Sequence, residues 1–312
     1  MLNQTVLKEF FLSGLSDLPA IQFPLFFSIL LIYLLTLFWN LLIVALIITN
    51  SHLHVPMYFF LGNLASLDFF YSSVTVPRML FDLHTGSRKI TKSACMTQVF
   101  FFLFFAASET FLLSVMSYDR YMAICQPLHY IKIMSCNVCV RLMSFVWCLS
   151  LIYSLVQTFY ASKLTFCGSS HIIESFFCDL PQVLQNSCSD ISINILLIFI
   201  LRSFLGGGSQ TLTFLSYVYI FRTILKIKVT GTRSKVFSTC TPHLLVVVLY
   251  QGFAFFNYFQ LKFSHHFTGN KGVSIFYTVI LPFLNPLIYS LRNQDIRAAF
   301  RDVVWKIIPN AR

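Results

Sequence analysis

Seven apolar stretches, each long enough to cross the hydrocarbon core of a bilayer, are the feature that most restricts the fold of this chain. A transmembrane helix needs about 20 mostly apolar residues, because backbone amides cannot remain unpaired in lipid. The stretches cover approximately residues 23–48, 57–80, 96–121, 140–160, 191–225, 236–259 and 273–291. With 57% hydrophobic and only 11% charged residues, the chain is far more apolar than a water-soluble fold requires. The sequence therefore predicts an all-α membrane protein, a bundle of seven transmembrane helices.

The distribution of charge predicts the orientation of this bundle. If the N-terminus lies outside the cell, the inner segments carry an excess of basic residues, whereas the outer segments mix both signs with almost no bias. We expect a single domain over residues 1–312, with an extracellular tail over residues 1–22 and a cytoplasmic tail over residues 292–312. Residues 293–307 alternate apolar and basic side chains, which is typical of an amphipathic helix on the inner leaflet.

The predicted outer side carries two kinds of modification site. Asn3 begins the sequon Asn-Gln-Thr, an acceptor for N-glycosylation. Four cysteines lie at or beyond the outer ends of the spans, where solvent is oxidising: Cys95, Cys167, Cys178 and Cys188. Four cysteines permit three pairings, and spacing alone does not choose among them. A disulfide from the top of the third span to the second outer loop is expected.

Two motifs lie where a helix bundle could change shape. Asp119-Arg120-Tyr121 ends the third span, where an arginine is costly unless it pairs or meets a partner in a water-filled crevice. A switchable ion pair fits that position, although such a pair at a helix end is usually an interfacial anchor. Residues 282–289, PFLNPLIY, place two prolines and Asn285 inside the seventh span. Proline bends a helix, which predicts a segment able to repack between two states.

Longer motifs around these two give the chain a resemblance. They are PMYFFL at residues 56–61, MSYDRYMAIC at 116–125, KVFSTC at 235–240 and PLIYSLRN at 286–293, with FCDLP at 177–181 in a long second outer loop. In this order, and over nearly the whole chain, they resemble the odorant receptors of the rhodopsin-like, G-protein-coupled class. The second outer loop is similar to that of the tetrapod, class II type.

The resemblance implies a function and several residue roles. An odorant receptor binds a small volatile or apolar organic ligand in the outer half of the bundle and activates a stimulatory G protein, which raises cyclic AMP. Its place is the plasma membrane of olfactory sensory cilia. Cys95 would pair with Cys178, and Cys167 with Cys188. The residues implied in activation and in admitting the C-terminal helix of the G protein are Asp119, Arg120, Tyr121, Tyr217, His243, Asn285, Pro286 and Tyr289.

The chain departs from the odorant-receptor pattern at several places. Trp39 precedes Asn40 where the family usually has glycine, Ser117 replaces alanine, and Pro242 replaces serine. The largest departure is Gln251, which stands where the family has a tyrosine beneath the ligand. That substitution bears on ligand tuning and activation.

Two carboxylates lie inside the predicted spans. Asp68 and Glu109 each cost on the order of 2.5 to 3.5 kcal/mol near a bilayer centre if charged and unpartnered. We therefore expect both to face the interior, with Asn40, Ser114 and Asn285 as neighbours. The carboxylates would share a sodium ion, as the resemblance implies, or one would be protonated and hydrogen-bonded to the other. We favour the ion, and we expect no other cofactor.

A mostly apolar ligand pocket is expected in the outer half of the bundle, where helical spacing aligns one face of each contributing span. The candidate lining residues are Val99, Phe102, Leu103, Ala106, Ala107, Thr110, Arg202, Leu205, Gln251, Ala254, Phe255, Tyr258, Ile275 and Thr278. Taken singly, each fits helix-packing core, and Arg202 fits a side chain that snorkels to the interface. If Arg202 faces inward, it and Lys271 favour a ligand with a carboxylate or strong acceptor.

Other protein classes fit less well. The third span lacks the outer aspartate of an amine receptor, and the seventh lacks the lysine of an opsin. A transporter would be indicated by half-repeats or several intramembrane charges, and a membrane enzyme by a His or Cys cluster. Basic residues scattered over short segments do not form a nucleic-acid surface. The runner-up is a non-olfactory receptor of the same fold for a lipid or peptide.

Overall fold

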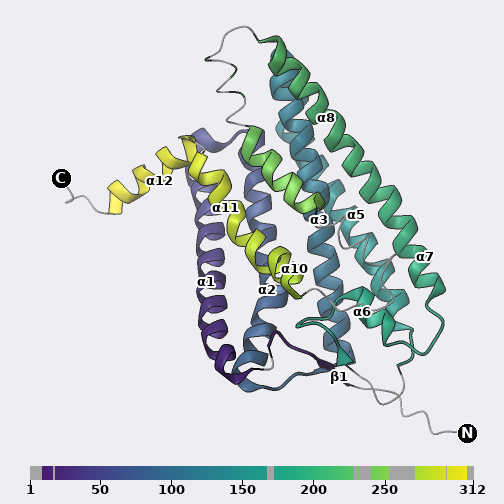
Figure 1. Ribbon diagram of the computed structural model, residues 1–312. Helices are drawn as coiled ribbons and strands as arrows, with labels where there is room; N and C mark the ends of the chain where they lie inside the picture. The colour runs from purple at the N-terminus through teal and green to yellow at the C-terminus, as the bar shows by residue number, and fades with distance from the viewer. Residues whose placement is uncertain are drawn as a thin grey trace, which may run out of the picture.

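The computed structural model describes residues 9–16, 18–166, 172–227, 231, 233, 236, 240–252, 271–292 and 294–307, and within them the chain is a bundle of long helices (Figure 1). The first four spans are α1 (Pro19–Thr49), α2 (Pro56–Thr85), α3 (Lys92–Cys125) and α5 (Cys136–Ser162). The fifth joins α7 (Ser192–Leu201), the π-helical turn η2 (Arg202–Gly206) and α8 (Gly207–Lys226). The sixth is described over Cys240–Gly252. The seventh joins α10 (Lys271–Ile275), the π turn η3 (Phe276–Ile280) and α11 (Leu281–Arg292).

Short elements connect or follow the spans. They are η1 (Ser51–Leu53), α4 (Pro127–Ile133), α6 (Leu180–Gln185) and α12 (Gln294–Ile307). The last occupies the place of the predicted amphipathic helix and leaves the bundle at an angle to α11 (Figure 1). Tyr58 Oη donates to Asp295 Oδ2 at 2.7 Å, and the rings of Trp39 and Phe300 lie 6.4 Å apart. Trp39, a departure from the family pattern, therefore contacts α12.

Helix length and composition suit a membrane. Five described helices are long and apolar enough to cross one, namely Ala20–Thr49, Lys92–Cys125, Cys136–Ser162, Ser192–Lys226 and Lys271–Tyr289. The 31 residues of α1 extend about 46 Å at 1.5 Å per residue, more than the hydrocarbon thickness of about 30 Å. The helix α2 is nearly as long but carries Asp68, Arg78 and Asp82. The fold class of the structure is the one that the sequence predicts.

One side of α1 consists of apolar side chains that face away from the bundle. Each of them is more than half exposed, and they recur every three or four residues: Phe23, Phe27, Leu31, Leu34, Phe38 and Leu41. The other side packs against α2 and α11 and contributes Ile43 and Leu46 to the core. An exposed stripe of this kind is unfavourable in water and favourable in lipid. It therefore marks the lipid face of α1.

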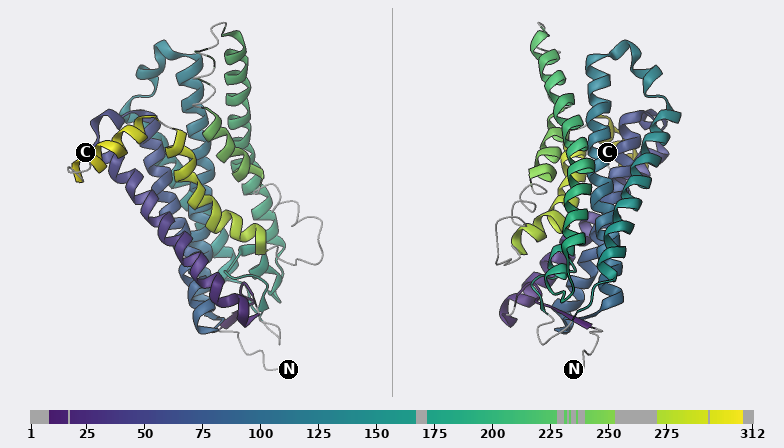
Figure 2. Two further views of the ribbon diagram at one scale, coloured as in Figure 1. Left: turned by 60° about the vertical axis from the view of Figure 1, so that its left-hand side comes forward. Right: turned by 90° about the vertical axis from the view of Figure 1, so that its right-hand side faces the viewer.

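A three-stranded sheet closes one end of the bundle, which we call the sheet end (Figure 2). Its middle strand, β1 (Glu9–Leu12), pairs antiparallel with β2 (Lys89–Thr91) and parallel with β3 (Ile172–Ile173). Phe10 and Leu12 are buried while the residues between them are exposed, as in a strand with one covered face. The sequence predicted only a tail here, because four residues carry too short an alternation. The opposite end, which bears α12, is the α12 end.

Two π turns, η2 and η3, lie within the fifth and seventh spans, and the sequence predicted neither of them. A π turn bonds residue i to i+5 and so changes the phase of the side chains that follow it. Gly206, Gly207 and Gly208 follow in the fifth span, and a run of glycines inside a helix allows either close helix approach or local bending. A Cβ at Gly207 or Gly208 would meet no described atom within 4 Å. The structure therefore supports a local distortion, at η2, and not close approach by a described helix.

Candidate functional site

A cavity of about 220 Å³ lies between the helices near the sheet end. The described residues that line it are Tyr71, Phe102, Leu103, Ala106, Ala107, Thr110, Phe111, Tyr153, Asp179, Leu180, Pro181, Ile198, Leu201, Arg202, Leu205, Gly206, Gln210, Tyr250, Tyr277 and Leu281. For scale, an apolar cavity of about 150 Å³ admits benzene. Because aromatic and aliphatic side chains form most of the wall, the cavity suits a small, mainly apolar organic molecule.

The third and fifth spans supply the wall residues that helical spacing picked out. Phe102, Leu103, Ala106, Ala107 and Thr110 of α3 and Arg202 and Leu205 of the fifth span all line the cavity. Val99, on the same predicted face, instead belongs to the buried cluster beneath the sheet. This part of α3 is a regular α-helix, so residues at these spacings point to the same side and line one wall of the cavity.

The sixth and seventh spans present other residues than those predicted. Tyr250 lines the cavity and Gln251 does not, since neighbouring residues on a helix point about 100° apart. Tyr277 and Leu281 line it in place of Ile275 and Thr278. The π turn η3 accounts for this difference, because it changes the helix phase around these residues. Three further predicted residues, Ala254, Phe255 and Tyr258, lie outside the described residues.

Two charged side chains of opposite sign line the cavity. Arg202, the first residue of η2, lines the cavity and so faces the bundle interior. Asp179 comes from the loop directly before α6. Burial raises the pKa of Asp179 to about 6, although the nearby Arg202 guanidinium opposes that rise. Lys271, the other predicted cation, begins α10 and is not among the described lining residues. Asp179 was not among the residues predicted to line the cavity, although its position next to Cys178 in the second outer loop pointed to this end of the bundle.

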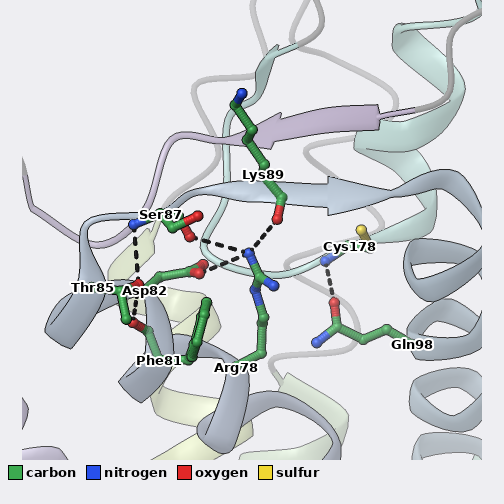
Figure 3. Close-up of polar contacts among 8 residues, drawn as sticks. All are labelled: Arg78, Phe81, Asp82, Thr85, Ser87, Lys89, Gln98 and Cys178. Carbon is green, nitrogen blue, oxygen red and sulfur yellow. Dashed lines mark hydrogen bonds and ion pairs between the residues drawn. The ribbon is translucent and has the colours of Figure 1, made fainter.

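The loop that carries Asp179 is fastened to α3 and α2. Cys95 and Cys178 form a disulfide, as the resemblance implied. Gln98 reinforces it: its Oε1 accepts from the backbone N–H of Cys178 at 2.9 Å (Figure 3), and its Nε2 donates to the carbonyl of Val74 at 3.0 Å. Asp179 therefore follows a residue whose backbone is held both covalently and by a buried amide side chain.

Two arginines bind the sheet to its surroundings, one to α2 and one to the N-terminal segment. Arg78 at the end of α2 pairs with Asp82 at 2.8 Å and donates to the carbonyl of Lys89 in β2 at 2.7 Å (Figure 3). Arg88, just before β2, donates at 2.8 Å to each of two carbonyls of the N-terminal segment, those of Ser13 and Ser16. These hydrogen bonds connect α2 to β2, and the residue before β2 to the segment around β1.

A layer of polar groups is buried deeper in the bundle. Asp68 and Glu109 are completely buried, and Asn285 Nδ2 donates to both carboxylate oxygens of Asp68 at 3.0 Å. Glu109 faces Asp68 and Tyr250, yet its two oxygens form no hydrogen bond of good geometry with the described residues. Among the same residues Asn285 Oδ1 also has no donor. Oxygen atoms without donors suit a hard cation such as sodium.

The other predicted neighbours of these carboxylates make contacts elsewhere. Asn40 donates to the carbonyl of Pro282 at 3.2 Å and so ties α1 to α11. Ser114 donates to the carbonyl of Ser209 at 3.1 Å and so ties α3 to α8. Only Asn285 among the three predicted neighbours bonds to a carboxylate of the layer.

The motif Asp119-Arg120-Tyr121 lies at the α12 end of α3. Asp119 is buried and accepts a hydrogen bond from Tyr130 of α4 at 2.9 Å, and it forms no ion pair with Arg120. Arg120 is within electrostatic range of Tyr217 and His243, whose side chains are hydrogen-bonded to each other. That bond joins α8 to the sixth span. Tyr121 packs against Tyr219, with ring centroids 5.8 Å apart.

The seventh span brings further predicted residues to this place. Pro286 lies inside α11, and Tyr289 lies within electrostatic range of Tyr217 and Arg120. The hydroxyl of Tyr289 has no hydrogen bond within the described part of the chain. The structure therefore gathers Arg120, Tyr217, His243 and Tyr289 between α3, α8, the sixth span and α11.

An exposed apolar pair on α4 was missed by the sequence analysis. Leu128 and Ile131 are 94% and 84% exposed and lie three residues apart, on the same face of the helix. Tyr130 between them holds Asp119. Large apolar side chains this exposed are typical of a contact site for another protein or for lipid. A seven-residue helix in a loop is too short to be predicted from periodicity.

Two of the predicted modification sites fall partly or wholly outside the described residues. Cys188 is disulfide-bonded, but Cys167 lies outside the described part of the chain, so the pairing of these two stays a prediction. Asn3 also lies outside it.

Comparison with known proteins identifies the family. A family model for olfactory receptors matches residues 29–308. Olfactory receptor 5B12 of Homo sapiens is 43% identical over 306 residues, which cover 98% of this chain and 97% of the relative. Olfactory receptor 1G1 of Gorilla gorilla gorilla is 45% identical over 303 residues, which cover 97% and 96%. The match confirms the family predicted from the motifs. The chain belongs to the olfactory receptor family: it is a multi-pass plasma-membrane receptor for odorants that couples to G proteins and is not an enzyme.

Proposed function

We propose that the receptor lies with its sheet end outside the cell, binds a small, mainly apolar odorant in the cavity near that end, and activates a stimulatory G protein at the α12 end, raising cyclic AMP. The observation that carries this proposal is the cavity of about 220 Å³, which is lined by residues of nearly every span. A ligand that touches so many helices can change their relative packing. Olfactory sensory cilia are the proposed location.

Disulfide chemistry and charge support the proposed orientation. The Cys95–Cys178 disulfide lies at the sheet end, and disulfides persist in oxidising, extracellular surroundings. Arg222 and Lys226 lie near the other end of the fifth span, where cytoplasmic basic residues are expected. The proposal treats residues 1–312 as one receptor domain, with residues 1–22 outside and glycosylated at Asn3, and residues 292–312 in the cytoplasm.

The two π turns offer a route from ligand to G protein. Arg202, Leu205 and Gly206 of η2 and Tyr277 of η3 line the cavity, so a ligand contacts the distorted turns directly. The turn η2 continues into α8, which carries Tyr217, and η3 continues into α11. A change of packing at these turns would therefore shift the groups around Arg120. The exposed pair Leu128 and Ile131 would then contact the G protein.

Asp68, Glu109 and Asn285 are the residues we propose to hold a sodium ion. The oxygens of Glu109 and Asn285 that accept no hydrogen bond from the described residues support this assignment. We expect Asp68→Asn to lower odorant signalling and remove its dependence on sodium while surface expression stays unchanged, because an ion site biases a conformational equilibrium. Ser66→Ala is the control: Ser66 lies two residues before Asp68 on α2, and its hydroxyl donates to the carbonyl of Gly62 within the same helix. Equal sodium responses in the variant and the native receptor would exclude the ion.

Cavity filling combined with a cyclic AMP reporter tests the ligand site. Leu205→Trp fills the wall of the cavity and should abolish responses to a panel of volatile odorants in cells that display the receptor. Leu215→Trp, on the same span but 46% exposed on its outer side, should leave the responses intact. Equal responses of the two variants would place the ligand elsewhere. Activation only by lipids or peptides would favour a non-olfactory receptor, and activation without cyclic AMP would exclude the stimulatory G protein.

A further inference from the structure

The charged groups of the cavity are gathered on one side of it. Asp179 and Arg202 interact with each other electrostatically, and both also lie within electrostatic range of Tyr153 on α5 and Tyr277 on η3. All four residues line the cavity, and we call them the polar side. The Arg202 guanidinium acts electrostatically on the Asp179 carboxylate, so a ligand that enters this side of the cavity meets both charges.

This arrangement changes what Arg202 does to a ligand. A carboxylate would gain the attraction of Arg202 but would also be repelled by the Asp179 carboxylate in the same low-dielectric space. A protonated amine would meet the reverse situation. A neutral molecule avoids both repulsions and the loss of its own charge hydration. A neutral molecule can still bond to both side chains if it accepts a hydrogen bond from Arg202 and donates one to Asp179.

We propose that Asp179 and Arg202 together make the receptor selective for neutral odorants that carry both a hydrogen-bond donor and an acceptor, of the hydroxyketone class, over carboxylates. This inference rests on the proposed function, because it names the ligand class of the same cavity. It revises the expectation drawn from Arg202 and Lys271 alone, which favoured a carboxylate. The remaining wall, from Phe102 to Thr110 on α3 and at Leu205, would hold the apolar part of the ligand.

The test uses the full receptor in cells and a panel of matched triplets, in which each carbon skeleton is supplied as a carboxylic acid, a ketone and a hydroxyketone. In the native receptor the hydroxyketone should have the lowest half-maximal concentration at neutral pH. Asp179→Asn removes the repulsion, so it should make the carboxylic acids about tenfold more potent. Arg202→Gln should weaken the carboxylic acids and hydroxyketones while the plain ketones change least.

Asp190→Asn is the matched control. It removes the same charge from an aspartate that bonds to Ser192 at the start of α7 and does not line the cavity. It should leave all three ligand classes unchanged. If Asp179→Asn fails to reach the surface, the double variant Asp179→Asn/Arg202→Gln, which removes both charges, should lose the preference between ligand classes but keep its response to ketones.

The inference would be overturned by a native receptor that prefers carboxylates, by equal effects of Asp179→Asn and Asp190→Asn, or by a double variant that keeps the native preference. A native receptor that answers only to plain ketones would also overturn it, while leaving the proposed function standing. A native receptor that reaches the surface but answers to no volatile compound would overturn the proposed function itself.

Discussion

The two ends of the receptor are held together by different kinds of bond. Several contacts of different kinds hold the sheet end. They are the Cys95–Cys178 disulfide, the three-stranded sheet, the hydrogen bond of the Gln98 amide and the hydrogen bonds of the Arg78 and Arg88 guanidinium groups. At the α12 end the described ties between α3, α4, α8 and the sixth span include single side-chain hydrogen bonds, such as Tyr130 to Asp119. A single hydrogen bond contributes only about 0.5 to 1.5 kcal/mol net. The difference fits the proposed function, in which the firmly tied sheet end receives the ligand and the loosely tied α12 end rearranges.

Removing the covalent tie should have the largest effect. Cys178→Ser frees the second loop from α3 and should abolish surface display, since loss of a native disulfide typically costs about 2 to 5 kcal/mol. Cys148→Ser, an exposed free cysteine on α5, is the control and should display normally. Flow cytometry of a tagged receptor gives the measurement. Normal display of Cys178→Ser would show that the sheet end does not depend on its disulfide.

The amide tie at the sheet end should come next. Gln98→Ala leaves the buried N–H of Cys178 without an acceptor, which costs about 1 to 3 kcal/mol. The melting temperature of the purified receptor should fall clearly. Thr97→Ala, the neighbouring residue on the exposed side of α3, bonds only within its own helix and should change the melting temperature little. Equal melting temperatures of the two variants would mean that the Gln98 hydrogen bond does not stabilise the sheet end.

At the α12 end we expect a change in signalling rather than in stability. Tyr217→Phe removes the bond to His243 that joins α8 to the sixth span, so basal cyclic AMP per displayed receptor should rise about fivefold, as loss of about 1 kcal/mol implies. Tyr219→Phe, on the exposed side of the same helix, should leave basal signalling unchanged. Unchanged or lower basal signalling in Tyr217→Phe would mean that this bond does not restrain the resting state.

The smallest effect should be a pH dependence at the sheet end. Burial raises the pKa of Asp179 to about 6, from about 3.9 in an unfolded chain, so its contribution to stability falls as pH rises from about 4 to about 6 and is level above that. Arg202, Tyr153, Tyr277 and Tyr71 are the described charged or titratable groups that act on it or sense it.

Melting temperatures measured across that interval check this sign. The melting temperature of the native receptor should fall relative to that of Asp179→Asn as pH rises from about 4.5 to about 6.5. The difference in melting temperature between the native receptor and Asp190→Asn should stay constant over this interval. Hydrogen bonds from Ser192 lower the pKa of Asp190 and so move its titration to more acidic conditions. A constant difference for Asp179→Asn as well would mean that its carboxylate is not buried.

The sequence predicted the elements whose signal is long and regular. Apolar runs identified the spans, and helical spacing placed Phe102 and Ala106 on the cavity wall because α3 is a regular helix there. In and next to the π turn η3 the residues on the cavity wall differ from those predicted, as at Thr278, because one extra residue in a turn leaves no mark in hydropathy. Asp179 was missed for another reason: tertiary contacts of a loop, and not local periodicity, bring it to the cavity.

The strand order at the sheet end has a consequence for how the receptor is made. The central strand precedes all the spans in the chain, whereas its parallel neighbour includes Ile173 and is made after four of the spans have been completed. The central strand can pair with β2 once two spans are complete, but its other edge must stay unpaired until Ile172 and Ile173 have been made. Contacts between residues so distant in the chain form late and slowly. A bulky group attached close to Glu9 would meet the nascent receptor at this unfinished stage, so its harm should appear as poor maturation and not as weak odorant binding.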